Sequence, residues 1–151
     1  MKLLMVCLGN ICRSPLAEGI MQNKINAKKL DWKVDSAGTG AWHVGELPDP
    51  RSIDVAKKYG IDITRQRGRQ FKAADFDAFD YIFAMDASNY NNIIKLAKND
   101  AQKQKVSMIM NWADPGMNQG VPDPYHDNDG FENVYDMIDR ACDSVVEKLV
   151  L

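Results

Sequence analysis

Short apolar runs recur along the chain and predict four buried strands. They occupy the ranges Lys2–Cys7, Trp32–Ala37, Tyr81–Met85 and Val106–Met110. Runs of this length without polar interruption are typical of parallel strands that are covered on both faces. The stretch 37–49 is rich in glycine and proline, which predicts a long loop after the second strand.

Segments with helical spacing of apolar residues separate these strands. Ser14 followed by Pro15 predicts a hydroxyl N-cap and a proline at the first helical position, and this helix extends to Lys28-Lys29. Shorter helices are expected at Ile53–Tyr59 and Ser88–Lys98. The clearest helix is the last, whose broad apolar stripe consists of Phe131, Val134, Tyr135, Ile138, Ala141, Cys142, Val145, Val146 and Leu149.

Strands that alternate with helices predict an α/β fold with a parallel sheet and helices on both faces. No repeat, low-complexity tract or linker divides the sequence, so one domain over residues 1–151 is expected. In sheets of this kind, ligands bind beyond the carboxyl ends of the strands, where the strand order reverses. The loop that leaves the first strand is therefore the first place to look for chemistry.

Composition narrows the class of protein. The 151 residues are 45% hydrophobic and 26% charged, which is typical of a globular domain and excludes a disordered chain. The net charge of −2 favours neither nucleic acid nor an anionic membrane as a partner. Three cysteines do not make a disulfide framework, and the longest apolar run, Leu3 to Leu8, is too short to span a membrane. We therefore expect a cytoplasmic protein.

The loop after the first strand, CLGNICRSP, has the residue types of an oxyanion cradle. Backbone N–H groups in a tight turn, together with a helix start, would point into one concavity. Gly9 and Asn10 tolerate the positive φ that such a turn needs. Arg13 would close the cradle, and Cys7 would lie at its base as a thiolate placed for in-line attack on phosphorus. The alternative, an ordinary buried cysteine near a helix start, requires all these features to coincide by chance.

At these residues the chain resembles the low-molecular-weight protein tyrosine phosphatases. The segment CLGNICRSPLAEG (Cys7–Gly19) is similar to that family's signature loop and first helical turn. Further similar segments follow in family order over nearly the whole chain: DSAGTG (Asp35–Gly40), PDPRS (Pro48–Ser52), FDYIFAMD (Phe79–Asp86) and DPY (Asp123–Tyr125). The resemblance implies a single-domain flavodoxin-like fold. It also implies hydrolysis of phosphotyrosine through a Cys7 phosphocysteine, with Arg13 binding phosphate and no metal or cofactor.

Asp123 is the expected general acid. A thiolate cannot expel a poor leaving group unless an acid protonates the ester oxygen. Pro122 and Pro124 would stiffen the loop around this carboxyl, although the local sequence alone fits an ordinary turn equally well. The resemblance implies that Asp123 protonates the leaving oxygen and then activates the water that hydrolyses the phosphocysteine.

The resemblance also implies the surroundings of the substrate. Trp42 would lie beside the substrate ring and form an apolar slot with Ile11 and Tyr125, unless it packs on its own loop instead. Related enzymes that act on phosphoarginine carry a small polar residue at the position of Ile11. Ser36 is expected to support the loop from behind. The expected substrate-binding residues are Leu8, Gly9, Asn10, Ile11, Cys12, Ser14, Trp42 and Tyr125.

Three positions depart from the family or are open to two interpretations. Cys12 fits equally a reversible disulfide with the nucleophile, as in the family, and a small buried side chain. The family histidine that supports the loop asparagine is missing, and the segment 64–68 puts Gln66 in its place. His126 replaces the usual second tyrosine, which leaves Tyr125 alone as a phosphorylation acceptor.

Two other functions fit parts of the pattern. Arsenate reductases share this fold and loop, but they relay a disulfide through further cysteines, and residues 71–99 contain none. A phosphotyrosine-binding module without catalysis would not need nucleophile, arginine and acid together. Two histidines and no His/Asp cluster give no reason to expect a metal. The expected partners are phosphotyrosine-containing proteins and a cognate tyrosine kinase, and the expected state is a monomer or weak dimer.

Overall fold

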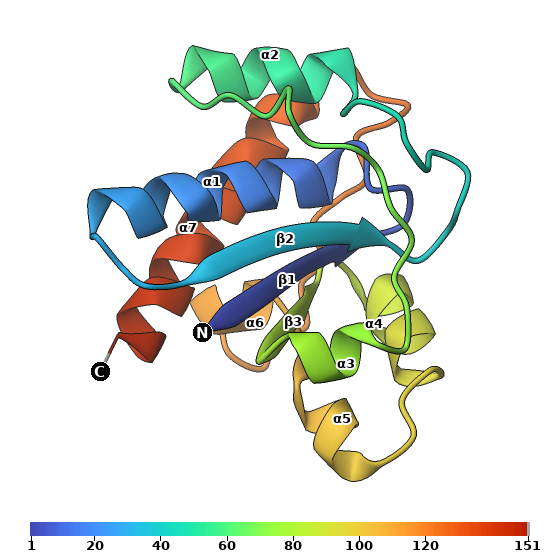
Figure 1. Ribbon diagram of the computed structural model, residues 1–151. Coiled ribbons are helices and arrows are strands. Elements are labelled where there is room, and N and C mark those ends of the chain that lie inside the picture. Colours follow the sequence, from blue (N-terminus) through green and yellow to red (C-terminus); the bar gives the residue numbers. More distant parts are fainter. Residues whose placement is uncertain (151) are drawn as a thin grey trace.

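A four-stranded parallel sheet lies at the centre of the computed structural model, which describes residues 1–150 (Figure 1). The strands are β1 (Lys2–Cys7), β2 (Lys33–Gly38), β3 (Tyr81–Ala84) and β4 (Val106–Met108), in the order β2-β1-β3-β4. The chain leaves β1 for β2 on one side and returns to β3 on the other. The strand order therefore reverses at the carboxyl end of β1, where such sheets bind ligands.

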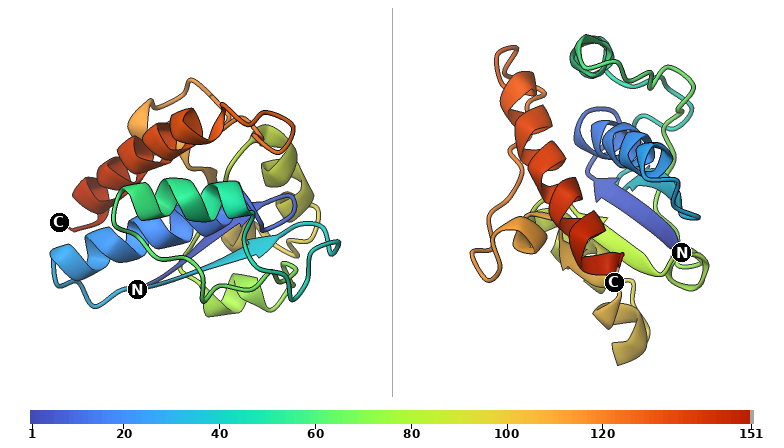
Figure 2. Two further views of the ribbon diagram at one scale, coloured as in Figure 1. Left: turned by 90° about the horizontal axis from the view of Figure 1, so that it is seen from above. Right: turned by 90° about the vertical axis from the view of Figure 1, so that its left-hand side faces the viewer.

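Helices cover both faces of this sheet, as the sequence predicts. Helices α1, α2, α6 and α7 lie on one face and α3 and α4 on the other, with α5 beside β4 (Figure 2). Among residues 1–150, none of the helices combines the length and the hydropathy needed to traverse a bilayer. The helices are α1 (Arg13–Ala27), α2 (Pro50–Lys58), α3 (Asp75–Ala78), α4 (Ala87–Ile94), α5 (Asp100–Gln104), α6 (Met110–Ala113) and α7 (Phe131–Leu149).

Strand β1 supplies both hydrophobic cores. Leu3 and Met5 pack into the core beneath α1 and α7, whereas Leu4 and Val6 face the opposite core around α3 and α4. All four side chains are fully buried. This burial on both faces is the physical reason for an apolar run without alternation, and it fixes the position at which Cys7 leaves the sheet.

The start of α1 differs from the prediction. The helix begins at Arg13, and its N-cap is Cys12, with no side-chain capping bond. Ser14 is therefore not the N-cap, and Pro15 lies at the third helical position. The hydroxyl of Ser14 is instead engaged by the loop that precedes the helix.

Several other boundaries also differ. Helix α2 begins at Pro50, because Asp49 caps it and proline is favoured at the first helical position. The prediction started at Ile53 because it followed the apolar spacing alone. Strand β2 is shifted by one residue, and α4 ends at Ile94 rather than Lys98. Met110 begins α6 instead of ending β4, and the short helices α3 and α5 were not predicted.

Helix α1 packs so closely on the segment that follows α2 that one glycine has no room for a side chain. A Cβ at Gly19 would lie 2.5 Å from Cγ2 of Ile63 and 3.0 Å from Cγ2 of Ile61. Alanine is favoured over glycine in a helix by about 1 kcal/mol, but overpacking costs about 1–3 kcal/mol. We predict that Gly19→Ala lowers the free energy of unfolding by about 1 kcal/mol in urea titrations. In an Ile63→Ala background the loss should shrink or reverse, and an equal loss in both backgrounds would contradict the packing argument.

Candidate active site

The loop between β1 and α1 curls around the sulfur of Cys7. The backbone N–H of Asn10 donates to Cys7 Sγ at 3.3 Å, and Cys7 Sγ lies 3.0 Å from Ser14 Oγ. Asn10 has a φ of +56°, so the expected left-handed residue of the turn is present. Gly9 does not have a positive φ; its lack of a side chain serves packing, since a Cβ would lie 3.1 Å from Cδ2 of His43.

The side chain of Asn10 holds this loop in place. Its Nδ2 donates to Ser14 Oγ at 2.8 Å and to Ser36 Oγ at 3.0 Å. Its Oδ1 accepts from the backbone N–H of Arg69 at 3.0 Å. Asn10, Ser14 and Ser36 are all buried, so these bonds satisfy polar groups that water does not reach. The Asn10 amide is therefore fixed by three segments of the chain at once.

Arg13 is a buried cation that faces the cradle. Its Nη1 donates to Asp86 Oδ2 at 2.6 Å and to the carbonyl of Val121 at 3.0 Å. Burial by itself would lower the pKa of Arg13, but the charge of Cys7 and the hydrogen bond to Asp86 raise it above its ordinary value. The guanidinium therefore stays charged. Asp86 also caps α4 through its other oxygen, which accepts from the N–H of Asn89.

Asp123 reaches the same cleft from the loop that precedes α7. One of its oxygens accepts from the N–H of Tyr125 at 3.1 Å, and the other lies 3.7 Å from Nη2 of Arg13. Its side chain is about half exposed. The carboxyl is thus oriented by its own turn and remains accessible from the cleft.

Arg51, at the start of α2, ties the Asp123 loop to the cradle. Its guanidinium binds both oxygens of Asp49 and donates to the carbonyl of Tyr125 at 2.9 Å and to Oδ1 of Asn128 at 2.6 Å. The backbone N–H of Asp49 in turn donates to the carbonyl of Ile11 at 2.8 Å. One arginine therefore connects the loop that carries Asp123 with the loop that carries Cys7.

A cleft of about 230 Å³ opens above Cys7. Trp42 is 71% exposed, and its ring lies against Gly40, so it lines the cleft and also packs on its own loop. Asn10, Ser14 and Ser36 do not line the cleft but lie behind the loop. The cleft is lined by Cys7, Leu8, Gly9, Ile11, Cys12, Arg13, Trp42, His43, Asp123, Tyr125 and His126.

The cysteines differ in their surroundings. Burial, followed by the charge of Asp49, raises the pKa of Cys12 to about 12. Cys12 is therefore a neutral thiol at physiological pH, although it lines the same cleft as Cys7. Cys142 is fully buried in α7 among core residues.

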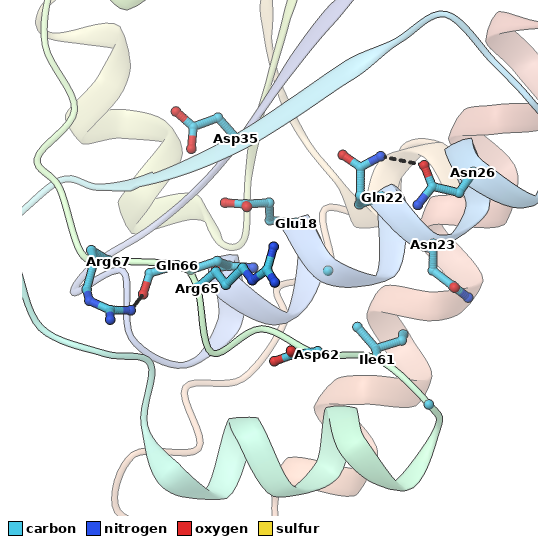
Figure 3. Close-up of a pocket in the computed structure, with 12 residues that line it drawn as sticks. Glu18, Gln22, Asn23, Asn26, Asp35, Ile61, Asp62, Arg65, Gln66 and Arg67 are labelled. Atoms are coloured by element: carbon cyan, nitrogen blue, oxygen red, sulfur yellow. Dashed lines mark hydrogen bonds between the residues drawn. The ribbon is translucent and has the colours of Figure 1, made fainter.

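A second and larger pocket, of about 450 Å³, lies between α1, β2 and residues 60–67 (Figure 3). Glu18 extends into it from α1 and accepts a hydrogen bond from Ser36 Oγ at 2.7 Å. Burial raises the pKa of Glu18 to about 7, and Asp35 adds to this effect. Gln66 lines the same pocket and donates to the carbonyl of Pro15, whereas the Asn10 amide is supported by Arg69 instead.

Sequence reasoning missed three residues that the structure brings to the site. Asp86 carried a signal, because it directly follows the expected strand Tyr81–Met85, and the structure places that strand beside β1. Arg51 is part of a segment similar to the family, but its contacts depend on a loop more than 70 residues away. Glu18 carried no signal, since a glutamate in a helix is ordinarily exposed.

The chain is similar to known proteins over nearly its whole length. A family model described as low molecular weight phosphotyrosine protein phosphatase matches residues 2–150. A phosphatase of that name from Schizosaccharomyces pombe is 46% identical over 138 residues, which cover 89% of this chain and 87% of the relative. A protein tyrosine phosphatase structure from Entamoeba histolytica has a TM-score of 0.93 at 39% identity, covering 99% and 97% of the two chains. A structure named Drosophila arginine phosphatase has a TM-score of 0.91 at 35% identity, covering 98% and 97%.

The burial of Glu18 predicts a pH-dependent stability. Its pKa of about 7 in the folded chain lies above the ordinary value of 4.5, so the folded state binds the extra proton between these pH values. Stability then falls as pH rises from about 4.5 to 7. Glu18→Gln has no carboxyl to titrate at this position, so this pH dependence is lost. The free energy of unfolding of the variant should therefore rise by roughly 2–3 kcal/mol relative to that of wild type across this pH range. Urea unfolding at pH 4–8 measures the difference.

Asp62→Asn is the matched control. Asp62 lines the same pocket, but hydrogen bonds from Thr64 lower the pKa of its carboxyl, so it is already ionised across this window. Its stability difference from wild type should stay constant between pH 5 and 7. A constant difference for Glu18→Gln as well would show that Glu18 titrates like an exposed carboxyl.

Proposed function

Because the chain belongs to the low molecular weight phosphotyrosine protein phosphatase family, we propose that it hydrolyses phosphotyrosine through a phosphocysteine on Cys7. As a member of this family it is a protein tyrosine phosphatase, a phosphoric monoester hydrolase that acts on phosphotyrosine-containing substrates. The observation that carries the finer proposal is the meeting of Cys7, Arg13 and Asp123 in one cleft.

The first step transfers the phosphoryl group to sulfur. Arg13 and the backbone N–H groups of the loop bind the phosphate oxygens, and the Cys7 thiolate attacks phosphorus in line. The S–P bond forms as the P–O bond to tyrosine breaks. Asp123 gives its proton to the departing oxygen, so tyrosine leaves as the neutral phenol. The position of Asp123 at the mouth of the cleft, facing Arg13, supports this role.

The second step returns the enzyme to its starting state. Asp123, now a carboxylate, takes a proton from a water molecule as its oxygen attacks phosphorus. The S–P bond breaks and Cys7 leaves as the thiolate, which Ser14 Oγ and the N–H of Asn10 stabilise by hydrogen bonds. Inorganic phosphate is released, and Asp123 again carries the proton that the next cycle requires.

The walls of the cleft favour an aromatic substrate. Ile11, Trp42 and Tyr125 line it above the polar base. Apolar and aromatic walls bind the phenyl ring of phosphotyrosine, which lifts its phosphate farther from the peptide backbone than that of phosphoserine. Phosphoarginine is the alternative substrate, because one similar structure is named an arginine phosphatase. The apolar Ile11 in the cleft favours the phenyl ring over a guanidinium.

The chemistry of the nucleophile indicates where the protein works. A thiolate nucleophile requires a compartment that keeps thiols reduced, so we place the protein in the cytoplasm. A cognate tyrosine kinase and a monomeric or weakly dimeric state remain predictions of the sequence.

The leaving group separates the roles of Cys7 and Asp123. We predict that Cys7→Ser abolishes turnover of every substrate. Asp123→Asn should lower kcat/KM, which reports the first step alone, by about 10²–10⁴-fold for phosphotyrosine and alkyl phosphates. The loss should be much smaller for aryl phosphates with good leaving groups, such as p-nitrophenyl phosphate, because these need little protonation. Steady-state kinetics on a series of leaving groups, with chelator present, make the measurement.

Other outcomes are equally informative. Equal losses across the series would remove Asp123 from the role of acid. Loss of activity with chelator would contradict the metal-free mechanism. Turnover of phosphoarginine above that of phosphotyrosine peptides, in fully reduced protein, would reassign the substrate while leaving the covalent mechanism in place.

Cys12 is the proposed resolving thiol for an oxidised nucleophile. Peroxide converts the Cys7 thiolate to a sulfenic acid and is itself reduced to hydroxide. The Cys12 thiol then displaces the hydroxyl, which leaves as water, and a Cys7–Cys12 disulfide forms. The high pKa of Cys12 supports this order of events, because the neutral thiol is not itself the target of peroxide.

Peroxide inactivation tests the pairing. Wild-type activity lost to hydrogen peroxide should return with dithiothreitol, because the disulfide is reducible. In Cys12→Ser the sulfenic acid has no resolving thiol and proceeds to the sulfinic acid, so the recovered fraction of that variant's own initial activity should be much lower. Cys142→Ser is the matched control and should recover like wild type. Equal recovery in all three proteins would exclude the disulfide.

A further inference from the structure

We propose that the carboxylate of Glu18 is a positioning group for the Cys7 sulfur. It acts through three side chains in series, Ser36, Asn10 and Ser14, each hydrogen-bonded to the next. We call this series the relay. The series ends at the Ser14 Oγ to Cys7 Sγ contact of 3.0 Å. The inference rests on the proposed function, because the group it positions is the nucleophile of that reaction.

The donors along this series have a fixed direction. Ionised Glu18 can only accept, so the hydroxyl of Ser36 gives its hydrogen to Oε1 of Glu18. The oxygen of Ser36 then accepts from Nδ2 of Asn10, whose other hydrogen goes to Ser14. The backbone N–H of Arg69 bonds Oδ1 of Asn10 and excludes the flipped amide.

The last donor in the series faces the sulfur. Because Ser14 Oγ accepts from Asn10, its own hydrogen is free to be donated. Cys7 Sγ lies 3.0 Å away, whereas the carbonyl of Ala37 lies at 3.5 Å. Donation to a thiolate is charge-assisted and stronger than donation to a neutral carbonyl. An ionised Glu18 therefore favours the arrangement in which Ser14 stabilises the nucleophile.

Protonation of Glu18 weakens this arrangement. A neutral carboxyl is a poorer acceptor and can itself donate to Ser36, which removes the charge-assisted bond at the head of the series. Hydrogen bonds in a buried series polarise one another, so the loss reaches Asn10 and the loop. Burial of Glu18 raises its pKa to about 7, which places the change inside the physiological range.

Charged groups from every packed element act on Glu18. Asp35 on β2 raises its pKa, and Arg69, in the segment before α3, lowers it. Arg69 is itself held between Asp35 and Asp75. The remaining charged residues of the pocket are Asp62, Arg65 and Arg67. The pocket of about 450 Å³ beside Glu18 gives solvent a path to the carboxyl, so it can exchange its proton without opening the catalytic cleft (Figure 3).

Ratios of kcat/KM isolate this effect. The ionisations of Asp123 and of the substrate do not pass through these hydrogen bonds and cancel in the ratio of wild type to variant, which leaves the effect of Glu18 on the Cys7 sulfur. We expect the wild-type to Ser36→Ala ratio for p-nitrophenyl phosphate to rise about two- to tenfold between pH 6 and 8, with a midpoint near 7. Ser36→Ala keeps Glu18 but breaks its connection to Asn10, so a merely structural role would give a constant ratio.

Two further variants sharpen the test. Glu18→Gln keeps the shape of the side chain without its ionisation, so its ratio to Ser36→Ala should be independent of pH. Asp62→Asn removes a carboxylate of the same pocket that makes no contact with Ser36, and its ratio to wild type should also be constant. A wild-type ratio that falls with pH would overturn the proposal, because direct repulsion between the carboxylate and the thiolate would then dominate.

A signal that does not depend on turnover separates this inference from the proposed function. The ¹⁵N-bound Nδ2 protons of Asn10 should shift with a midpoint near pH 7 in wild type and in Asp62→Asn, and not in Glu18→Gln or Ser36→Ala. Titrating Asn10 signals in a wild-type protein without phosphatase activity would support the relay and refute the function. Normal turnover with a flat ratio and no Asn10 titration would refute the relay alone.

Discussion

The side-chain amide of Asn10 is the constraint on which the rest of the site depends. Its left-handed backbone is unfavourable for a residue other than glycine, and three buried hydrogen bonds compensate for this strain. These bonds reach α1, β2 and the backbone at Arg69, so the loop is fixed to the helix that follows it, to a neighbouring strand and to a distant segment. A cradle of backbone N–H groups is useful only if it is rigid before the anion arrives. The amide of Asn10 provides this rigidity without occupying the cleft.

Charge balance is the second requirement, and it explains the acidic residues around Arg13. A buried guanidinium beside a lone thiolate would leave one charge unpaired whenever the thiol is protonated. Asp86 lies 2.6 Å from Arg13 and does not line the cleft, whereas Asp123 lines it and lies farther from Arg13, at 3.7 Å. The nearer carboxylate therefore neutralises the arginine and leaves the farther one for the proton transfer proposed above.

The fold could be predicted from the sequence because buried strands and helices have recognisable patterns of apolar residues. The continuous apolar run of β1 and the stripe of α7 reflect contacts on every side of those elements. The short helices α3, α5 and α6 left no such trace, since four or five residues form no periodic pattern. The cradle and Arg13 could be located from residue types in one short segment. Asp123 was identified only through the family resemblance, because its local sequence fits an ordinary turn equally well. Arg51 and Glu18 could not, because their roles depend on partners that only the folded chain brings to them.

The carboxyl of Glu18 is a group whose ionisation destabilises the fold, and this cost points to a function. Its partly buried carboxyl has no ion-pair partner within 4 Å among residues 1–150, and ionisation there is unfavourable enough to raise the pKa to about 7. Glutamine would fill the same space without this cost. The feature that glutamine lacks is a charged acceptor for the hydroxyl of Ser36, and that hydroxyl links Glu18 to Asn10. The cost of the buried charge and the direction of the hydrogen bonds thus lead to the same atom, the sulfur of Cys7.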